Sequence, residues 1–286
     1  MAIIGLDIGG TKCALVTVAR RKGKVQTVCA FGTTTVQETL EGFFDRITEL
    51  DPGENPVFGV SCGGPLDSEH GVIQRPPNLP DWTDIPICAM LEARFGGEAF
   101  LMNDANAGAL AEWHYGAGRG TRNMIFLTAG TGMGAGLILD GHLYEGASGF
   151  AGEVGHIRLA PEGPIGHGKA GSFEGFCSGG GIAQLARVKA REMNGNVSFN
   201  PGSIEAISSL HVGRAAAAGD PVAREILARS GRYLGQALAL LMDVLNPEVI
   251  VLGSVFARCR PYLEPSMKDV LSQEALPQTR QICRIV

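Results

Sequence analysis

Asp7 ends an apolar run and is followed after one residue by Gly9, Gly10, Thr11 and Lys12. The two glycines tolerate positive φ and carry no Cβ, so backbone N–H groups can close on an anion. Thr11 adds a hydroxyl, Lys12 adds a cation, and the Asp7 carboxylate can recruit Mg²⁺ directly or through water. These groups suit a nucleotide phosphate. An ordinary glycine turn in a hairpin uses the same residue types, so this stretch alone leaves both interpretations open.

The same plan recurs about halfway along the chain. Residues 124–141 read as an apolar strand, a turn at Gly130, Thr131 and Gly132, and a second apolar strand. A repeat of this kind implies two similar α/β halves facing each other across a cleft. A strand rather than a helix follows the second turn, which argues against a dinucleotide-binding fingerprint, and no GxxxxGK[ST] motif occurs.

A third candidate group lies at Asn103 and Asp104, between a predicted strand at 99–102 and a predicted helix at 105–115. An aspartate before a helix usually caps its N-terminus, so Asp104 is expected at the cap or just before it. Ligands of α/β proteins, however, collect at the carboxyl ends of strands. That position favours a functional role for the pair.

Two further stretches carry polar groups. The glycine-rich residues 146–174 are predicted to form a long loop with Glu153, His156, His167 and Glu174, several of which are able to converge on one polyol. The alternative is that these side chains face solvent. Gly253 and Ser254 follow a predicted strand at 248–253 and form another turn of close approach.

Composition limits the function classes. The 286 residues are 45% hydrophobic and 19% charged, with a net charge of −5 and no basic run, which argues against a dedicated nucleic-acid surface. No apolar stretch approaches membrane-spanning length. Seven dispersed cysteines without a CxxC pair indicate reduced thiols, and the first strand begins close to Met1. A cytoplasmic protein is expected.

Periodicity and breaking residues outline the remaining elements. Beyond the strands named above, helices are predicted at 36–50, 86–95, 179–193, 203–210, 220–245 and 261–271, and a last strand at 281–286.

In combination, these stretches resemble the ROK family of sugar kinases, across essentially the whole chain. The motifs that carry the resemblance are DIGGTK, GGPLD with PPNLPDW, LMNDANAGALAE, LTAGTGMGAG and GFAGEVGH. The resemblance implies an α/β protein with the duplicated actin-like (ribonuclease H-like) ATPase fold. Two α/β domains, residues 1–105 and 106–286, would enclose an interdomain cleft holding ATP and sugar.

The resemblance also implies a role for each matching residue. Asp104 is the expected general base. The residues expected around the sugar are Gly64, Asn78, Asn103, Asp104, Glu153, His156 and Glu174. Those expected around the nucleotide are Asp7, Gly9, Gly10, Thr11, Lys12, Gly130, Thr131, Gly132, Gly253 and Ser254, with Mg²⁺ at Asp7 directly or through water.

The sequence departs from the family pattern in three places, one of which is that relatives normally continue past the final strand into a Gly/Ala-rich helix, whereas this sequence stops at Val286. Many relatives carry three cysteines that bind a structural zinc together with a histidine, but Ile165, His167 and Ser172 replace them here. His156 and His167 without thiolates make a poor tetrahedral site, so no zinc is expected and His156 is free to contact the sugar. The turn at Gly253 is also poorer in glycine than is usual.

The expected activity is therefore Mg²⁺- and ATP-dependent phosphorylation of a hexose hydroxyl, with the 6-OH of glucose preferred. The alternatives are N-acetylmannosamine, N-acetylglucosamine or fructose, because a methyl-sized difference in the pocket changes the preference. A non-catalytic sugar-sensing regulator is a further alternative. A homodimer or homotetramer is expected, with no nucleic-acid or membrane partner.

Overall fold

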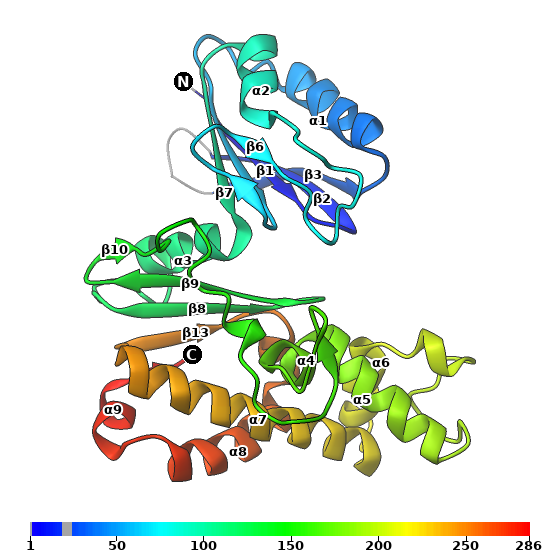
Figure 1. The fold of residues 1–286 in the computed structure, drawn as a ribbon. Coiled ribbons are helices and arrows are strands. Elements are labelled where there is room, and N and C mark those ends of the chain that lie inside the picture. Colours follow the sequence, from blue (N-terminus) through cyan, green and yellow to red (C-terminus); the bar gives the residue numbers. More distant parts are fainter. Residues whose placement is uncertain (1, 19–24) are drawn as a thin grey trace. The chain divides into compact units, whose positions relative to one another are not determined.

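The computed structural model describes residues 2–18 and 25–286. The chain divides into two compact units, one ending at Ala107 and the other running from Gly108 to Val286 (Figure 1). The division falls within helix α3 (Asp104–Tyr115).

The first unit is built on a five-stranded sheet in the order β3-β2-β1-β4-β7. β1 pairs antiparallel with β2 and parallel with β4, which in turn pairs parallel with β7. The strands are β1 (Ile3–Ile8), β2 (Lys12–Val18), β3 (Val25–Gly32), β4 (Val57–Cys62) and β7 (Glu98–Asn103). A small hairpin of β5 (Leu66–Asp67) and β6 (Val72–Ile73) follows β4.

Two helices, α1 (Val36–Leu50) and α2 (Ile87–Phe95), pack against the same face of this sheet. Their apolar residues form one buried cluster with the inward side chains of the strands, and the rings of Phe44 and Phe95 meet with centroids 6.1 Å apart. The Thr35 side chain caps α1 by accepting from the Glu38 N–H (3.2 Å). The predicted helix at 36–50 is confirmed.

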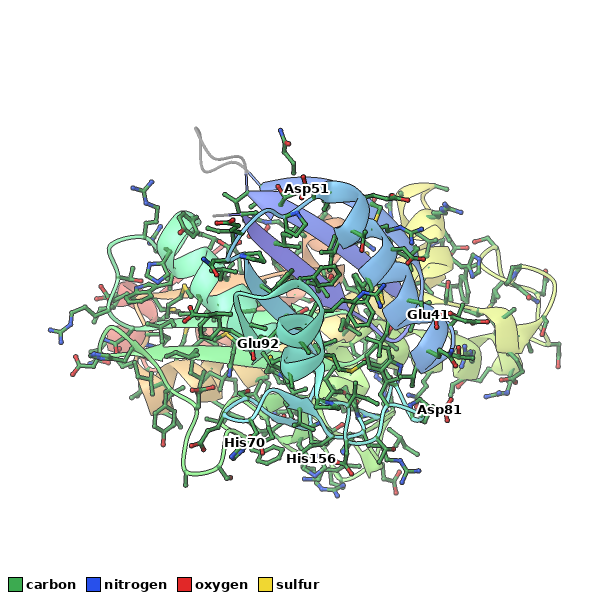
Figure 2. The ribbon with its side chains drawn as sticks, turned by 90° about the horizontal axis from the view of Figure 1, so that it is seen from above. Glu41, Asp51, His70, Asp81, Glu92 and His156 are labelled. Carbon is green, nitrogen blue, oxygen red and sulfur yellow. The ribbon has the colours of Figure 1, made fainter. Side chains whose placement is uncertain are left out.

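Carboxylates are numerous on the outside of the first unit. Glu41 on α1, Glu92 on α2, Asp51 and Asp81 are all exposed (Figure 2). Exposed carboxylates of this kind repel nucleic-acid phosphates.

The second unit repeats the plan with a sheet ordered β10-β9-β8-β13-β14. β8 pairs antiparallel with β9 and parallel with β13, as β1 pairs with β2 and β4. The strands are β8 (Met124–Ala129), β9 (Met133–Leu139), β10 (His142–Leu143), β13 (Val249–Leu252) and β14 (Arg284–Ile285). The internal repeat predicted from the two turns is confirmed.

Helices supply most of the buried apolar core of this unit. They are α4 (Phe173–Cys177), α5 (Gly179–Glu192), α6 (Ser209–Ala217), α7 (Pro221–Leu245), α8 (Val255–Glu274) and α9 (Pro277–Ile282), with 3₁₀ turns η1 (Val154–His156) and η2 (Ile204–Ala206) and the small hairpin of β11 (Ile165–Gly166) and β12 (Lys169–Ala170). Asp220 caps α7 by accepting from the Ala223 N–H (2.8 Å). No helix in the described ranges is long and apolar enough to cross a membrane.

Three predicted elements are corrected. The helix predicted at 203–210 is a 3₁₀ turn followed by α6, because Ser208 and His211 form a capping box that starts the helix at Ser209. The helix predicted at 261–271 begins earlier, at Val255, and continues through Pro261. The final strand is only Arg284–Ile285, because residues before it form α9, whose start is held by the distant Asp243 carboxylate.

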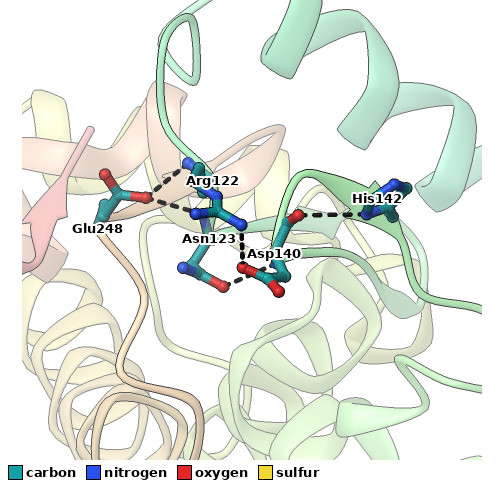
Figure 3. A network of polar contacts seen from close by, with 5 residues as sticks. All are labelled: Arg122, Asn123, Asp140, His142 and Glu248. Carbon is teal, nitrogen blue, oxygen red and sulfur yellow. Dashed lines mark hydrogen bonds and ion pairs between the residues drawn. The ribbon is translucent and has the colours of Figure 1, made fainter.

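A polar network joins the amino ends of neighbouring strands in the second sheet (Figure 3). One Glu248 oxygen accepts from the N–H groups of Arg122 (2.6 Å) and Asn123 (2.8 Å). The Arg122 guanidinium pairs with Asp140, whose backbone carbonyl contacts the His142 ring. The network fixes β13 against β8 at the edge opposite the carboxyl ends.

The α7–α8 contact depends on glycine. A Cβ at Gly231 would collide with the Leu263 carbonyl of α8 and the Ser266 hydroxyl, and one at Gly235 would collide with the Met267 carbonyl. Gly42 on α1 offers a contrast, because a Cβ there would lie 3.4 Å from its nearest neighbours.

We predict opposite effects of alanine at these two helical positions. Gly231→Ala should lower the free energy of unfolding by about 1–3 kcal/mol, because overpacking forces α7 and α8 apart. Gly42→Ala should raise it by about 0.5–1 kcal/mol through helix propensity alone. Urea unfolding measures both, and equal stabilisation by the two substitutions would contradict the close α7–α8 packing.

Candidate functional site

The strand register of the first unit brings the predicted polar residues to one edge of its sheet. Ile8 lies opposite Cys62, and Cys62 opposite Asn103, so the parallel strands β1, β4 and β7 end side by side. The turn after β1, Gly63–Gly64 after β4, and Asp104 after β7 therefore emerge at the same edge. This is where α/β proteins hold ligands.

The turn between β1 and β2 is compact. The Gly9 N–H donates to the Lys12 carbonyl (3.2 Å), and the carbonyl of Thr11 accepts from the Thr33 N–H (3.2 Å). A Cβ on Gly10 would lie 2.6 Å from the Asn78 Cβ, so the turn is packed tightly against the loop that carries Asn78. Two predicted ligand groups, one for nucleotide and one for sugar, are thus in direct contact.

The Asn78 loop is anchored by its neighbours. The buried side chains of Leu79 and Trp82 lie in the core, and consecutive backbone bonds run from the Leu79 N–H to Pro76 and from the Trp82 N–H to Leu79. Asn78 itself is exposed. The sequence therefore fixes the loop while leaving the Asn78 amide available to a ligand.

At the end of β7 the structure corrects the expected cap. Asn103, not Asp104, caps α3: its Oδ1 accepts from the N–H groups of Ala105 (3.0 Å) and Asn106 (3.3 Å). The helix already begins at Asp104, whose Oδ1 accepts from the Ala105 N–H (2.8 Å). Oδ2 of Asp104 has no hydrogen-bond partner among the residues that the structure describes. Asp104 is thus relieved of the cap and has one carboxylate oxygen free.

The electrostatics of this edge are dominated by two carboxylates. Desolvation by the surrounding protein raises the pKa of Asp104 above its ordinary value, although the residue as a whole is exposed to solvent. Desolvation also raises the pKa of Asp7, and the nearby Asp104 carboxylate raises it further. A hydrogen bond from Ser61 and the charge of Lys12 act on the pKa of Asp7 in the opposite direction.

In the second unit, Gly130–Gly132 form the turn between β8 and β9, and α4 reaches it. Oε2 of Glu174 accepts from the Met133 N–H (2.9 Å). The prediction of one long loop at 146–174 is wrong. This region contains η1, the hairpin of β11 and β12, and the start of α4, which Ser172 caps.

Of the other polar residues predicted in this region, Glu153 precedes η1 and is exposed, and His156 ends η1 and is also exposed (Figure 2). A Cβ on Gly155, between them, would lie 3.3 Å from the Glu174 Cβ, so η1 packs against α4. The His156 and His167 rings lie edge to face with centroids 5.9 Å apart. Ser172, at the third position expected to carry a cysteine in many relatives, has its oxygen engaged in the α4 cap.

The predicted adenosine turn lies beside the strand that precedes the second phosphate turn. The Gly253 N–H donates to the Leu127 carbonyl (2.9 Å), and the hydroxyls of Ser254 and Thr128 lie 3.5 Å apart. Ser254 has φ +55° and ψ −114°, a conformation that non-glycine residues rarely adopt. The strained residue and the turn share the carboxyl edge of the second sheet.

Sequence reasoning missed two groups that contact the turns. Thr33 bonds to the first turn, and Gly179 and Gly180 at the start of α5 bond to the second. The run Ser178–Gly181 at the start of a predicted helix was a usable signal, because three glycines in succession indicate close backbone approach. Nothing in the sequence around Thr33 distinguishes it from its threonine neighbours.

Fold and site together define a protein with the duplicated actin-like ATPase fold, in which a glycine turn joins the first two strands of each sheet. The family model for the ROK family matches residues 3–286. The chain belongs to the ROK family.

Relatives include both enzymes and regulators. A glucokinase of Thermotoga maritima is 31% identical over 97% of this chain and 89% of its own length. The DNA-binding transcriptional repressor Mlc of Escherichia coli is 30% identical over 78% of this chain, but over only 54% of its own length. A ROK family glucokinase from Streptomyces griseus, solved with glucose and AMPPNP, superposes with a TM-score of 0.80, at 29% identity, over 95% of this chain and 90% of that one.

We predict that Gly10→Ala weakens binding of both nucleotide and sugar. The added methyl group cannot share space with Asn78, so the turn or the Asn78 loop must move, at a cost of about 1–3 kcal/mol, which corresponds to about 5-fold to 150-fold in affinity. Calorimetric titration with AMPPNP and with glucose measures both effects.

Gly59→Ala in β4 is the matched control, because a Cβ there meets nothing within 4 Å. It should leave both affinities within about twofold. Loss of nucleotide affinity alone in Gly10→Ala would show that the Asn78 loop does not respond to the turn.

Proposed function

We propose that this chain is an ATP-dependent sugar kinase that phosphorylates a hexose hydroxyl, with the 6-OH of glucose as the preferred acceptor. The observation that carries the proposal is the accessible Asp104 carboxylate with its raised pKa, at the same sheet edge as the glycine turn after Asp7. The glucokinase relatives support the same activity.

In the proposed reaction Asp104 is the general base. Its free oxygen would accept the proton of the sugar hydroxyl as that oxygen attacks the γ-phosphorus of ATP. A carboxylate whose pKa is raised is a stronger base than an ordinary aspartate. Asn103 would orient it, because the Asn103 amide oxygen holds the first N–H groups of α3.

The remaining residues would bind and orient the substrates, since phosphoryl transfer depends mostly on positioning and charge stabilisation. The turns at Gly9–Lys12 and Gly130–Gly132 would hold phosphates, and Gly253–Ser254 would lie against the adenosine. Gly64, Asn78, Glu153, His156 and Glu174 would bind sugar hydroxyls. One oxygen of Glu174 already accepts a hydrogen bond from the Met133 N–H, which leaves its second oxygen for the sugar.

Mg²⁺ fits the donor set at Asp7, because the Asp104 carboxylate and the Ser61 hydroxyl, which both act on Asp7, supply oxygens of the kind that Mg²⁺ prefers. When bound there with ATP, the ion would offset the negative charge of the transferred group. In the part of the chain that the structure describes, no cluster of three or more histidine, cysteine or acidic side chains is arranged to hold a metal alone. Asp7 would therefore share Mg²⁺ with phosphates and water.

A sugar-responsive regulator is the second candidate, because Mlc and xylose repressors are among the relatives. The proposed base favours the kinase, since a sensor that only binds sugar needs no proton acceptor at Asp104. We also propose, from the resemblance, a small N-terminal α/β domain (residues 1–105) and a larger C-terminal one (residues 106–286), a cytoplasmic location and a homodimer or homotetramer. Limited proteolysis, localisation of a tagged protein and light scattering test these points.

An ADP-release assay with Mg-ATP across a sugar panel tests the function. We expect turnover on glucose that exceeds turnover on N-acetylmannosamine, N-acetylglucosamine and fructose. Asp104→Asn should lose more than about 99% of the turnover, as removal of a general base typically costs 10²–10⁴-fold. Binding of glucose to this variant should persist.

Asp45→Asn, an exposed aspartate on α1, is the matched control and should keep full turnover. Preference for an acetylated sugar or fructose would change the substrate but keep the mechanism. Binding of sugar without turnover on any of them would instead support a regulator.

The raised pKa of Asp104 predicts the pH dependence of turnover and of stability. Because the base must be ionised, kcat should fall on acidification through a pKa above the ordinary aspartate value of 3.8.

A raised pKa in the folded state also means that folding favours the protonated carboxyl, so the ionised group destabilises the fold above that pKa. Asp104→Asn should therefore unfold at no lower temperature than the parent at pH 7.5. A clear drop in its melting temperature would show that the carboxylate is instead a stabilising group.

A further inference from the structure

A backbone turn that binds phosphate through its N–H groups also brings carbonyl oxygens close to the anion. Its N–H groups attract the anion, but its carbonyl oxygens carry the opposite partial charge and repel it. The turn therefore needs donors from elsewhere in the protein that occupy the carbonyls and hold them away from the ligand. The structure shows where those donors come from.

In the first turn, a single residue, Thr33, supplies two such donors. The Thr33 hydroxyl donates to the Gly9 carbonyl (2.5 Å), and the Thr33 N–H donates to the Thr11 carbonyl (3.2 Å). The N–H groups of Gly10 and Thr11 have no acceptor within the described ranges 2–18 and 25–286. With the carbonyls of Gly9 and Thr11 occupied, these N–H groups are the ones that the turn offers to an anion.

The second turn has the same arrangement with different donors. The N–H groups of Gly179 and Gly180, at the start of α5, donate to the carbonyls of Gly130 (2.8 Å) and Thr131 (3.2 Å). The N–H groups of the turn itself, from Gly130 to Gly132, find no acceptor in the described part of the chain. The recurrence in two units with unrelated donor segments indicates that occupied carbonyls serve the turn rather than local packing.

We propose that Thr33 is a positioning residue for nucleotide binding: its hydroxyl holds the Gly9 carbonyl back so that the first turn presents its N–H groups to a phosphate. The proposal rests on the proposed function, in which this turn binds ATP. Unlike the donors of the second turn, the Thr33 hydroxyl is a side-chain group and can be removed without touching the backbone.

The neighbouring threonines make other hydrogen bonds, so substitutions there are controls for Thr33. Thr34 and Thr39 are linked by a bond from the Thr34 N–H to the Thr39 hydroxyl (3.1 Å), and Thr35 caps α1. Thr33 also lies 3.3 Å from the Cys13 thiol, a contact within the sheet that valine replaces with an apolar one. Only Thr33 of this run bonds to the turn.

The test compares Thr33→Val, Thr33→Ser and Thr35→Val in the full chain. AMPPNP affinity in the presence of Mg²⁺ is measured by calorimetry, and KM for ATP, KM for glucose and kcat by ADP release. Thr33→Val should weaken AMPPNP binding and raise KM for ATP about tenfold, the loss expected for one hydrogen bond. KM for glucose should stay within about twofold. Thr33→Ser retains the hydroxyl and should restore AMPPNP affinity to within about twofold of the parent.

Thr35→Val controls for a merely structural effect. It should lower the urea midpoint through loss of the α1 cap while leaving AMPPNP affinity unchanged. If Thr33→Val fails to fold, Thr33→Ala replaces it in the same measurements.

The outcomes separate the two proposals. Parent protein that binds AMPPNP but phosphorylates no sugar would overturn the kinase and leave Thr33 testable through binding. An unchanged AMPPNP affinity in Thr33→Val, or an equal loss in Thr35→Val, would overturn the role of Thr33 alone. A parent that does not bind AMPPNP would overturn both.

Discussion

The arrangement of the first unit depends on one constraint, the register of its three parallel strands. Ile8, Cys62 and Asn103 are aligned across β1, β4 and β7, so these strands stop at a common line. A shift of one residue would turn each strand's inward side chains outward, and the buried face of Leu6 and Ile8 prevents such a shift. The packing of α1 and α2 on that face therefore also fixes where the Asp7 turn and Asp104 emerge. Core and site are determined by the same side chains.

Holding two carboxylates at this edge has an energetic consequence. Burial raises the pKa of both Asp7 and Asp104, and their mutual repulsion adds to the effect at Asp7. The Ser61 hydroxyl and the Lys12 cation offset part of this. A fold selected only for stability would place neutral residues here. The carboxylates are better explained by a ligand with a complementary positive charge, such as Mg²⁺, and by proton transfer.

Much of this architecture could be predicted from the sequence, for identifiable reasons. The hairpins around the two turns, α1 and the cap of α7 rest on local signals: apolar periodicity, glycine pairs, and an Asp-Pro start. The sequence failed where a distant partner decides the outcome. Asp243 holds the start of α9 from more than thirty residues away, and Asn103 rather than its neighbour caps α3 because the strand pairs through Asn103 itself. The contact between Gly10 and Asn78 likewise joins two segments that no local pattern connects.

The two turns of the repeat meet the same electrostatic requirement with different hydrogen-bond donors. Both must turn their carbonyls away from an anion, yet one relies on the hydroxyl and the N–H of a single threonine and the other on the first N–H groups of a helix. The helical solution constrains the sequence through shape, because a Cβ on Gly180 would lie 2.9 Å from the Thr131 carbonyl that its own N–H holds. The hydroxyl solution constrains it through chemistry, because the residue at position 33 must carry a hydrogen-bond donor on its side chain. The second turn should thus tolerate no larger side chain at Gly180. The first turn should tolerate no loss of the side-chain donor at position 33, although both turns perform the same electrostatic task.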